Sequence, residues 1–172
     1  MCLATSLAYS QELNIHDIDS LSIKIAYPLM DSAKNRKVLI YQEGCSGCYS
    51  LDECGCSDGT IESYLIWQSN AKFKIKTLNC CEDEKNQEID FGNDLWSQLI
   101  EQSVFQTNFK TDYIETHYDF YKVIYLNGSN MEQLLIRSNY LSSKNTYKAY
   151  NESQPGYVFW KRLRQEISKI EK

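Results

Sequence analysis

Six closely spaced cysteines are the residues best able to do chemistry in this 172-residue chain. Thiols at such spacing can act as a redox pair, hold a zinc ion or form disulfide bonds. The residues around them distinguish these three uses. The six are Cys45, Cys48, Cys54, Cys56, Cys80 and Cys81.

The pair Cys45-Ser-Gly-Cys48 follows a β-like run, which is also the context of a thioredoxin-like redox site. That chemistry needs a helix beginning at the first cysteine, because the helix dipole lowers the pKa of the thiol. Residues 49–59 are too interrupted for such a helix. Thioredoxin-like folds also place a cis-proline downstream against the pair, whereas the only prolines here are Pro28 and Pro155. A thiol–disulfide enzyme is therefore the alternative and not the main interpretation.

A zinc site would need four thiolate or imidazole ligands at tetrahedral spacing. The two histidines, His16 and His117, are remote from the cysteines in sequence. The cysteine spacing fits no known zinc module, so we expect neither a metal nor another cofactor. Metal binding through Cys45 and Cys48 is kept with the redox alternative.

A disulfide framework fits the cysteines best, since an even number of them is typical of exported proteins. Adjacent cysteines bridge only with strain, so Cys80 and Cys81 should each reach back to a cysteine in residues 45–56. Closing a loop of ~30 residues contributes about 3–4 kcal/mol in the chain-entropy model. We expect these bonds to hold the irregular segment against the sheet, with the pairing left open.

The N-terminal stretch MCLATSLAYSQE suggests export. It is small and apolar, has no charge before Glu12, and offers Ala8 and Ser10 to a signal peptidase. It resembles the junction of exported bacterial proteins, although the basic start and long apolar run of a full signal are missing. We therefore expect residues 1–10 to be the remnant of a secretion signal, and the protein to be periplasmic or extracellular.

Glu115-Thr-His117-Tyr-Asp119 places a histidine between two carboxylates. A general base oriented by an acid is conceivable there, and on a strand the three side chains would share one face. No nucleophile motif accompanies them, so we expect no catalytic residues and lean against an enzyme.

Periodicity predicts the elements that position these residues. Strands are expected where apolar and polar residues alternate or where apolar residues run together. Amphipathic helices are expected from Asn93 or Asp94 and from Pro155, and residues 82–92 read as an acidic connection. Asn127-Gly128 predicts a hairpin turn. The expected strands are residues 21–27, 38–42, 61–68, 72–78, 118–126 and 131–136.

Hairpins followed by helices predict an α+β domain over residues 11–172, in which two helices cover one face of an antiparallel sheet of about six strands. Disulfide bonds would brace it. Apolar residues make up 42% of the chain, a globular composition. No other segment has the ~18 apolar residues that a membrane-spanning helix needs.

Residues 139–157 form a polar stretch with Tyr140, Tyr147, Tyr150 and Tyr157. Segments that mix tyrosine, serine and asparagine suit protein contacts, although these tyrosines could also simply pack on the sheet. The net charge of −5 and the absence of a basic cluster argue against nucleic acid. We therefore expect a small exported inhibitor or immunity-type protein that binds another protein, such as a basic toxin or hydrolase.

Overall fold

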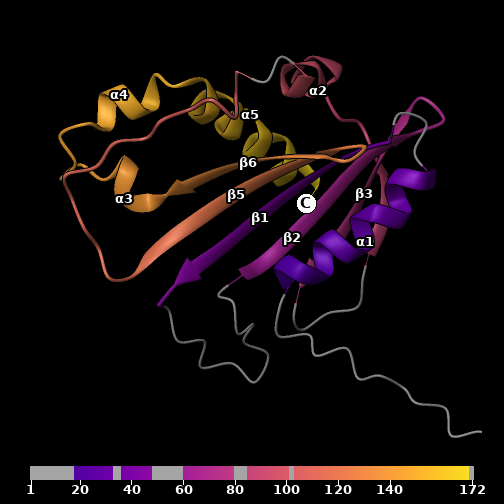
Figure 1. Ribbon diagram of the computed structural model, residues 1–172, viewed down its shortest axis with the longest axis horizontal. Helices are drawn as coiled ribbons and strands as arrows, with labels where there is room; N and C mark the ends of the chain where they lie inside the picture. Colours follow the sequence, from indigo (N-terminus) through magenta and orange to yellow (C-terminus); the bar gives the residue numbers. More distant parts are fainter. Residues whose placement is uncertain (1–17, 33–35, 48–59, 80–84, 101–102, 171–172) are drawn as a thin grey trace, which may run out of the picture.

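The computed structural model describes residues 18–32, 36–47, 60–79, 85–100 and 103–170. Within them, six strands form one sheet and five helices surround it, an α+β architecture (Figure 1). The expected fold class is confirmed at that level. The elements are α1 (Ile18–Ser32), β1 (Lys37–Ser46), β2 (Thr60–Ser69), β3 (Lys72–Asn79), β4 (Lys85–Ile89), α2 (Asn93–Ile100), β5 (Tyr118–Asn127), β6 (Asn130–Arg137), α3 (Ser138–Leu141), α4 (Lys148–Glu152) and α5 (Pro155–Ile170).

The sheet has the order β4-β3-β2-β1-β5-β6, and every neighbouring pair is antiparallel. The predicted strands that became β1, β2, β3, β5 and β6 are confirmed. The β5–β6 hairpin is confirmed too, with Asn127 opposite Asn130 and Gly128 at φ +60°. The central strand β1 lies between β2 and β5, so side chains from these three strands are neighbours on each face of the sheet.

The strand predicted over residues 21–27 is wrong, because this stretch lies in α1. The buried positions of that helix are Ile18, Ser22, Ala26 and Met30, which recur every four residues and form one helical stripe. Pro28 was expected to end the element, yet it is exposed within the helix.

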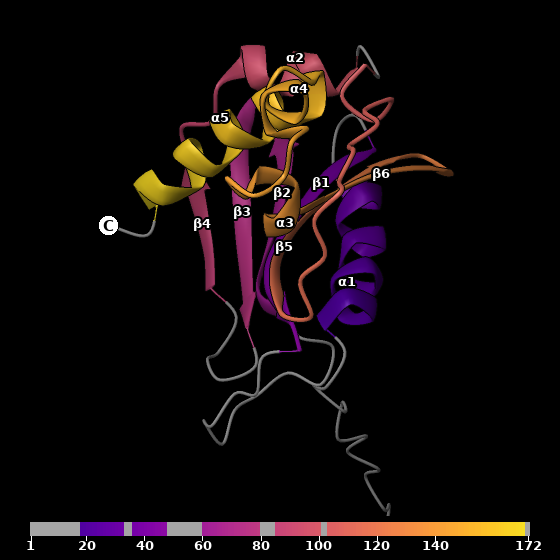
Figure 2. The same ribbon diagram turned by 90° about the vertical axis from the view of Figure 1, so that its left-hand side faces the viewer.

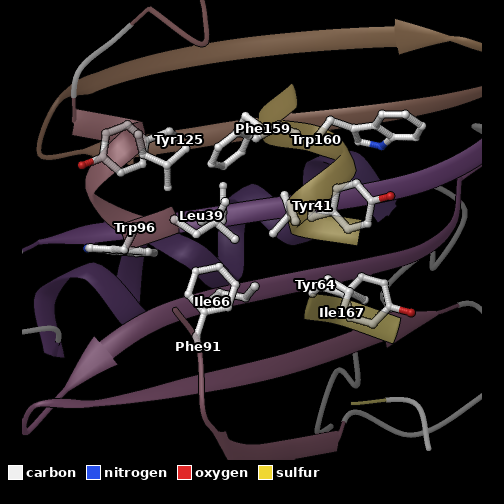
Figure 3. Close-up of a cluster of buried hydrophobic side chains, with 14 of the residues drawn as sticks. Leu39, Tyr41, Tyr64, Ile66, Phe91, Trp96, Tyr125, Phe159, Trp160 and Ile167 are labelled. Atoms are coloured by element: carbon white, nitrogen blue, oxygen red, sulfur yellow. The ribbon is translucent and has the colours of Figure 1, made fainter. Parts of the chain in front are cut away.

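Helices cover both faces of the sheet, which corrects the expectation of one covered face (Figure 2). On one face, α2 and α5 bury a large aromatic and aliphatic core that includes Leu39, Tyr41 and Trp160 (Figure 3). On the other face, α1 packs against β1 and β2 over a smaller core. Side chains alternate between the two faces of a strand, so consecutive residues of β1 pack into opposite cores.

A buried polar cluster fixes α1 on its face of the sheet. Ser22 Oγ donates to the carbonyl of Ile18 at 2.6 Å, lies 2.8 Å from Ser63 Oγ, and accepts the Gln42 amide at 3.3 Å. Polar groups buried in this way need partners within the protein, so the cluster specifies how the helix sits on the strands.

Two further segments differ from the sequence expectation. Residues 85–89, expected to belong to a connection, pair with β3 as the edge strand β4. Residues 139–157, for which the sequence predicted no element before Pro155, include α4 and part of α3, and α5 begins at Pro155 as expected. In the described part of the chain, no helix has the length and apolarity required to cross a membrane.

Candidate functional site

Cys45 is the member of the cysteine cluster that the structure describes. It lies near the end of β1, is 7% exposed, and is opposite Asp119 of β5. The disulfide framework as a whole therefore stays a prediction. Cys48, Cys54, Cys56, Cys80 and Cys81 lie outside the described residues.

His117 lies beside Gly47 of the C-x-x-C motif. Gly47 has φ +76°, and a Cβ added to it would be 2.9 Å from Cδ2 of His117. Glu115 and His117 precede β5, so they do not share a strand face with Asp119 as the sequence suggested. Among the described residues, no group of three or more His, Cys, Asp and Glu side chains could hold a metal ion.

The tyrosine-rich segment is held in place by buried asparagines. Asn145 and Asn151 are 3% and 0% exposed. The Nδ2 group of Asn151 donates to the carbonyls of Lys110 and Tyr140 at 2.7 and 2.9 Å, and that of Asn145 reaches the same two carbonyls at 3.1 and 2.9 Å. Asn151 Oδ1 also accepts the backbone N–H of Lys110 at 2.9 Å. These bonds join the backbone at Lys110 to the backbone at Tyr140.

Further hydrogen bonds extend this connection. Asn139 Nδ2 donates to the carbonyl of Tyr113 at 3.2 Å. The Asp112 carboxylate accepts both the hydroxyl and the backbone N–H of Thr146. These two bonds lower the pKa of Asp112 because they favour its charged form. The segment around residues 110–113 and the segment around residues 139–151 therefore support each other.

The four tyrosines expected to contact a partner divide into two pairs. Tyr140 stacks on Phe109, with ring centroids 5.4 Å apart and an angle of 20° between the rings. The ring of Tyr157 packs against that of Trp160 of α5, with the two centroids 5.5 Å apart. These two rings are partly buried and anchor the segment.

Tyr147 and Tyr150 are the exposed pair, at 42% and 38%. Both rings face Lys110, whose Nζ lies 5.9 Å from the centroid of Tyr147 and 4.6 Å from that of Tyr150. A cation over aromatic rings is attracted by their negative faces. We call Lys110, Tyr147 and Tyr150 the tyrosine platform.

A second lysine–tyrosine pair joins the segment around residues 110–113 to the segment around residues 139–151. Lys144 Nζ donates to Tyr113 Oη at 3.1 Å and lies 5.1 Å from the centroid of that ring. This hydrogen bond raises the pKa of Lys144. The described surface here therefore combines exposed aromatic area with hydrogen-bonding groups of fixed position.

The sequence pattern predicted the tyrosines as contact residues but not the asparagines that position them. Asn139, Asn145 and Asn151 recur every six residues, and this spacing was the available signal. The spacing matches neither a helix nor a strand, so it predicts no element. The role of these asparagines depends on the carbonyls of Tyr113 and Lys110, which are 26 to 41 residues away in sequence.

No known protein family, curated protein or solved structure matches the chain. The function must therefore be argued from the residues themselves. The exposed tyrosines and the backbone held by buried asparagines fit a surface that binds another molecule.

Proposed function

We propose that this chain is a small exported binding protein that contacts another protein through the tyrosine platform. Its most specific form is a periplasmic or surface inhibitor of the immunity type. One observation carries the proposal: Tyr147 and Tyr150 are exposed on a backbone held by the fully buried amide of Asn151. A preorganised surface loses little entropy on binding, and tyrosine offers a large contact area with few rotatable bonds.

The expected partner is basic, such as a toxin or hydrolase. The chain carries a net charge of −5, and complementary charge accelerates the encounter of two proteins. The tyrosine platform itself is not the source of that charge, because its charged member is Lys110. In this proposal the platform supplies contact area, and the acidic charge lies elsewhere on the molecule.

Export and disulfide bracing belong to the same proposal. Cys45 is compatible with the framework, since it is buried at the end of the central strand. The other five cysteines of the framework lie outside the described residues. A bond there would attach the following segment to the sheet.

Replacing Tyr147 and Tyr150 together with serine should reduce recovery of the partner about tenfold, because aromatic anchors contribute about 1–2 kcal/mol or more to such contacts. The measurement is quantitative mass spectrometry of proteins retained by the purified chain from an extract of its source organism. Tyr27→Ser is the control, since Tyr27 is 51% exposed on α1. Equal recovery by all three proteins, or no protein retained by the wild type, would contradict the proposal.

A thiol–disulfide or metal-binding protein using Cys45 and Cys48 is the second candidate. The observation that favours it is the ring of His117 against Gly47, between the two cysteines of the motif. An imidazole beside a thiol can lower the thiol pKa or add a metal ligand.

Mass mapping of the cysteines distinguishes the two candidates. We expect no alkylation of the six cysteines in the 45–81 stretch of native protein before reduction, and alkylation of all six after reduction and unfolding. The binding proposal requires this result if disulfides brace the fold. A native thiol at Cys45 or Cys48 that alkylates rapidly, or stoichiometric zinc in protein purified without chelator, would instead support the second candidate.

A further inference from the structure

The segment that leads into β5 carries the most exposed large hydrophobic side chain of the described residues. Ile114 is 86% exposed, whereas Met131, the next in order, is 55% exposed. Moving such a side chain out of water is favourable, so a partner that covers it gains binding free energy. Single exposed apolar residues are common on protein surfaces. What distinguishes Ile114 is the backbone that presents it.

Hydrogen bonds fix the backbone immediately before Ile114. The carbonyl of Tyr113 accepts Asn139 Nδ2 at 3.2 Å and Thr111 Oγ1 at 2.8 Å. The backbone N–H of Tyr113 donates to Thr111 Oγ1 at 3.1 Å. Asn139 is itself buried, so its amide is a fixed donor. Both backbone polar groups of Tyr113 are therefore bound within the protein.

Packing fixes the other end of the segment. Gly47 directly follows β1, and a Cβ added to it would lie 2.9 Å from Cδ2 of His117 and 3.0 Å from the carbonyl oxygen of Thr116. The two stretches of chain are therefore in direct contact. Between its fixed ends the segment passes around α3 before it enters β5 (Figure 1, Figure 2). Ile114 lies between these two points of attachment.

The chain between the fixed ends has the features of an extended backbone. The side chains of residues 112, 114 and 116 are exposed and those of residues 113 and 115 are partly buried, an alternation typical of extended chain. Residues 112–116 belong to no helix or strand. In the described part of the chain, the backbone groups of Ile114 and Glu115 form no hydrogen bond. Such a backbone can pair with an extended stretch of another protein.

We propose that residues 112–116 are an inhibitory segment that occupies the cleft of a peptidase, with Ile114 in a pocket for small aliphatic side chains. The inference rests on the proposed function and deepens it by naming the class of hydrolase. A peptidase cleft recognises an extended backbone through hydrogen bonds and one side chain through a pocket, and the inhibitory segment offers both features. Because its backbone is already held in place, little conformational entropy is lost on binding.

The tyrosine platform is connected to the inhibitory segment. The Asp112 carboxylate accepts the backbone N–H of Thr146 at 3.1 Å. Asp112 is two residues before Ile114, and Thr146 directly precedes Tyr147. A central apolar anchor with further contacts around it is the usual arrangement of a protein interface. In this proposal Ile114 enters the cleft, and the platform contacts the surface beside it.

The test measures inhibition of elastase, chymotrypsin and trypsin, whose pockets accept small aliphatic, aromatic and basic side chains respectively. We expect the wild-type chain to inhibit elastase about tenfold more strongly than the other two enzymes. Ile114→Ser should weaken inhibition of elastase by about tenfold or more, because the pocket loses its aliphatic occupant. Ile114→Arg should transfer the preference to trypsin, and Ile114→Tyr should transfer it to chymotrypsin.

The matched control is Met131→Ser, which removes another exposed apolar side chain. Met131 is opposite Leu126, at the far end of β5 from the inhibitory segment, so the control should change inhibition of elastase by less than about twofold. A gain against trypsin in Ile114→Arg cannot come from misfolding, which would abolish inhibition of every enzyme. No inhibition of elastase by the wild type, equal weakening by Met131→Ser, or no gain against trypsin would overturn the proposal.

Failure of the inhibitory segment is separable from failure of the proposed function. Ile114→Ser and the Tyr147→Ser/Tyr150→Ser variant are compared for recovery of the partner from the source extract. If only the tyrosine variant loses the partner and elastase is not inhibited, the segment fails and the platform stands. If elastase is inhibited through Ile114 and the tyrosine variant keeps the partner, the segment stands and the platform fails.

Discussion

Replacing Asn151 with alanine should lower the free energy of unfolding by about 3 kcal/mol, measured by urea denaturation. The side chain is fully buried and makes three hydrogen bonds to backbone. The carbonyls of Lys110 and Tyr140 keep a bond from Asn145, whereas the N–H of Lys110 loses its side-chain acceptor. This value is the sum of that part-buried unpaired donor, at about 1 kcal/mol, and two lost bonds of about 1 kcal/mol each.

Two variants make this result specific. Asn108→Ala removes an exposed asparagine from the same region and should change stability by less than about 0.5 kcal/mol. Asn151→Asp keeps an acceptor for Lys110 but turns a carboxylate oxygen toward two carbonyls, so it should cost at least as much as alanine. Wild-type stability in Asn151→Asp would show that the amide donors do not hold the segment, and would remove the rigid backbone from the binding proposal.

The strands predicted correctly are those whose residues carry the contrast between core and solvent. Phe73 and Ile75 are buried in β3, whereas Lys72, the residue before Phe73, is exposed, as the alternation of side chains along a strand requires. Likewise α5 buries Leu163 and Ile167 on one stripe. In these elements the local pattern and the tertiary environment agree, so the sequence alone was sufficient.

The sequence pattern predicted the wrong element where one stretch fits both a two-residue and a four-residue period. Leu21-Ser-Ile-Lys-Ile25 alternates like a strand, yet Ser22 is buried and Lys24 is exposed on the helix that forms. The deciding residues were Ile18 and Met30, which lie outside the alternating run and extend the four-residue spacing.

The edge strand β4 could not be predicted for a different reason. Asn86, Gln87 and Glu88 are all exposed, so no buried face marks the strand in the sequence. The strand exists because its backbone pairs with β3, and an ion pair of Lys72 with Glu88 crosses that pair at 2.7 Å. Polar and charged edges of this kind also discourage pairing with other molecules.

The candidate sites show the same division. Tyr147 and Tyr150 were identified because composition alone marks an aromatic, polar segment. The two mirrored Tyr–Glu pairs were not, because Tyr41-x-Glu43 and Glu62-x-Tyr64 become mirrored only after β1 and β2 pair in register. An arrangement assembled from two strands is a property of the topology.

Raising the pH from about 10 to 12 should destabilise the protein steeply, and Tyr41 should be the main cause. Burial raises its pKa far above the ordinary value near 10, and the charge and hydrogen bond of Glu43 act in the same direction. The folded protein therefore keeps the phenolic proton, whereas the unfolded chain releases it above pH ~10. Stability is fully present below that pH and falls by about 1.4 kcal/mol per pH unit above it.

Other tyrosines add to this effect. Burial also raises the pKa of Tyr121, Tyr125 and Tyr157. Their shifts have the same sign, so the loss from Tyr41 alone, about 2.3 kcal/mol between pH 10 and 12, is a lower bound. Urea midpoints measured from pH 8 to 12, with ionised tyrosine followed by absorbance, give both the stability and the proton release.

Tyr41→Phe separates this titration from ordinary destabilisation. The variant loses the bond to Glu43 and should be less stable at pH 8, but its stability should fall less steeply above pH 10 because one held proton is gone. Phe159→Leu weakens the same core without removing a titrating group, so its slope should match the wild type. A Tyr41→Phe slope parallel to that of Phe159→Leu would mean that the Tyr41 hydroxyl does not retain its proton, and that its hydrogen bond to Glu43 does not hold that proton at high pH.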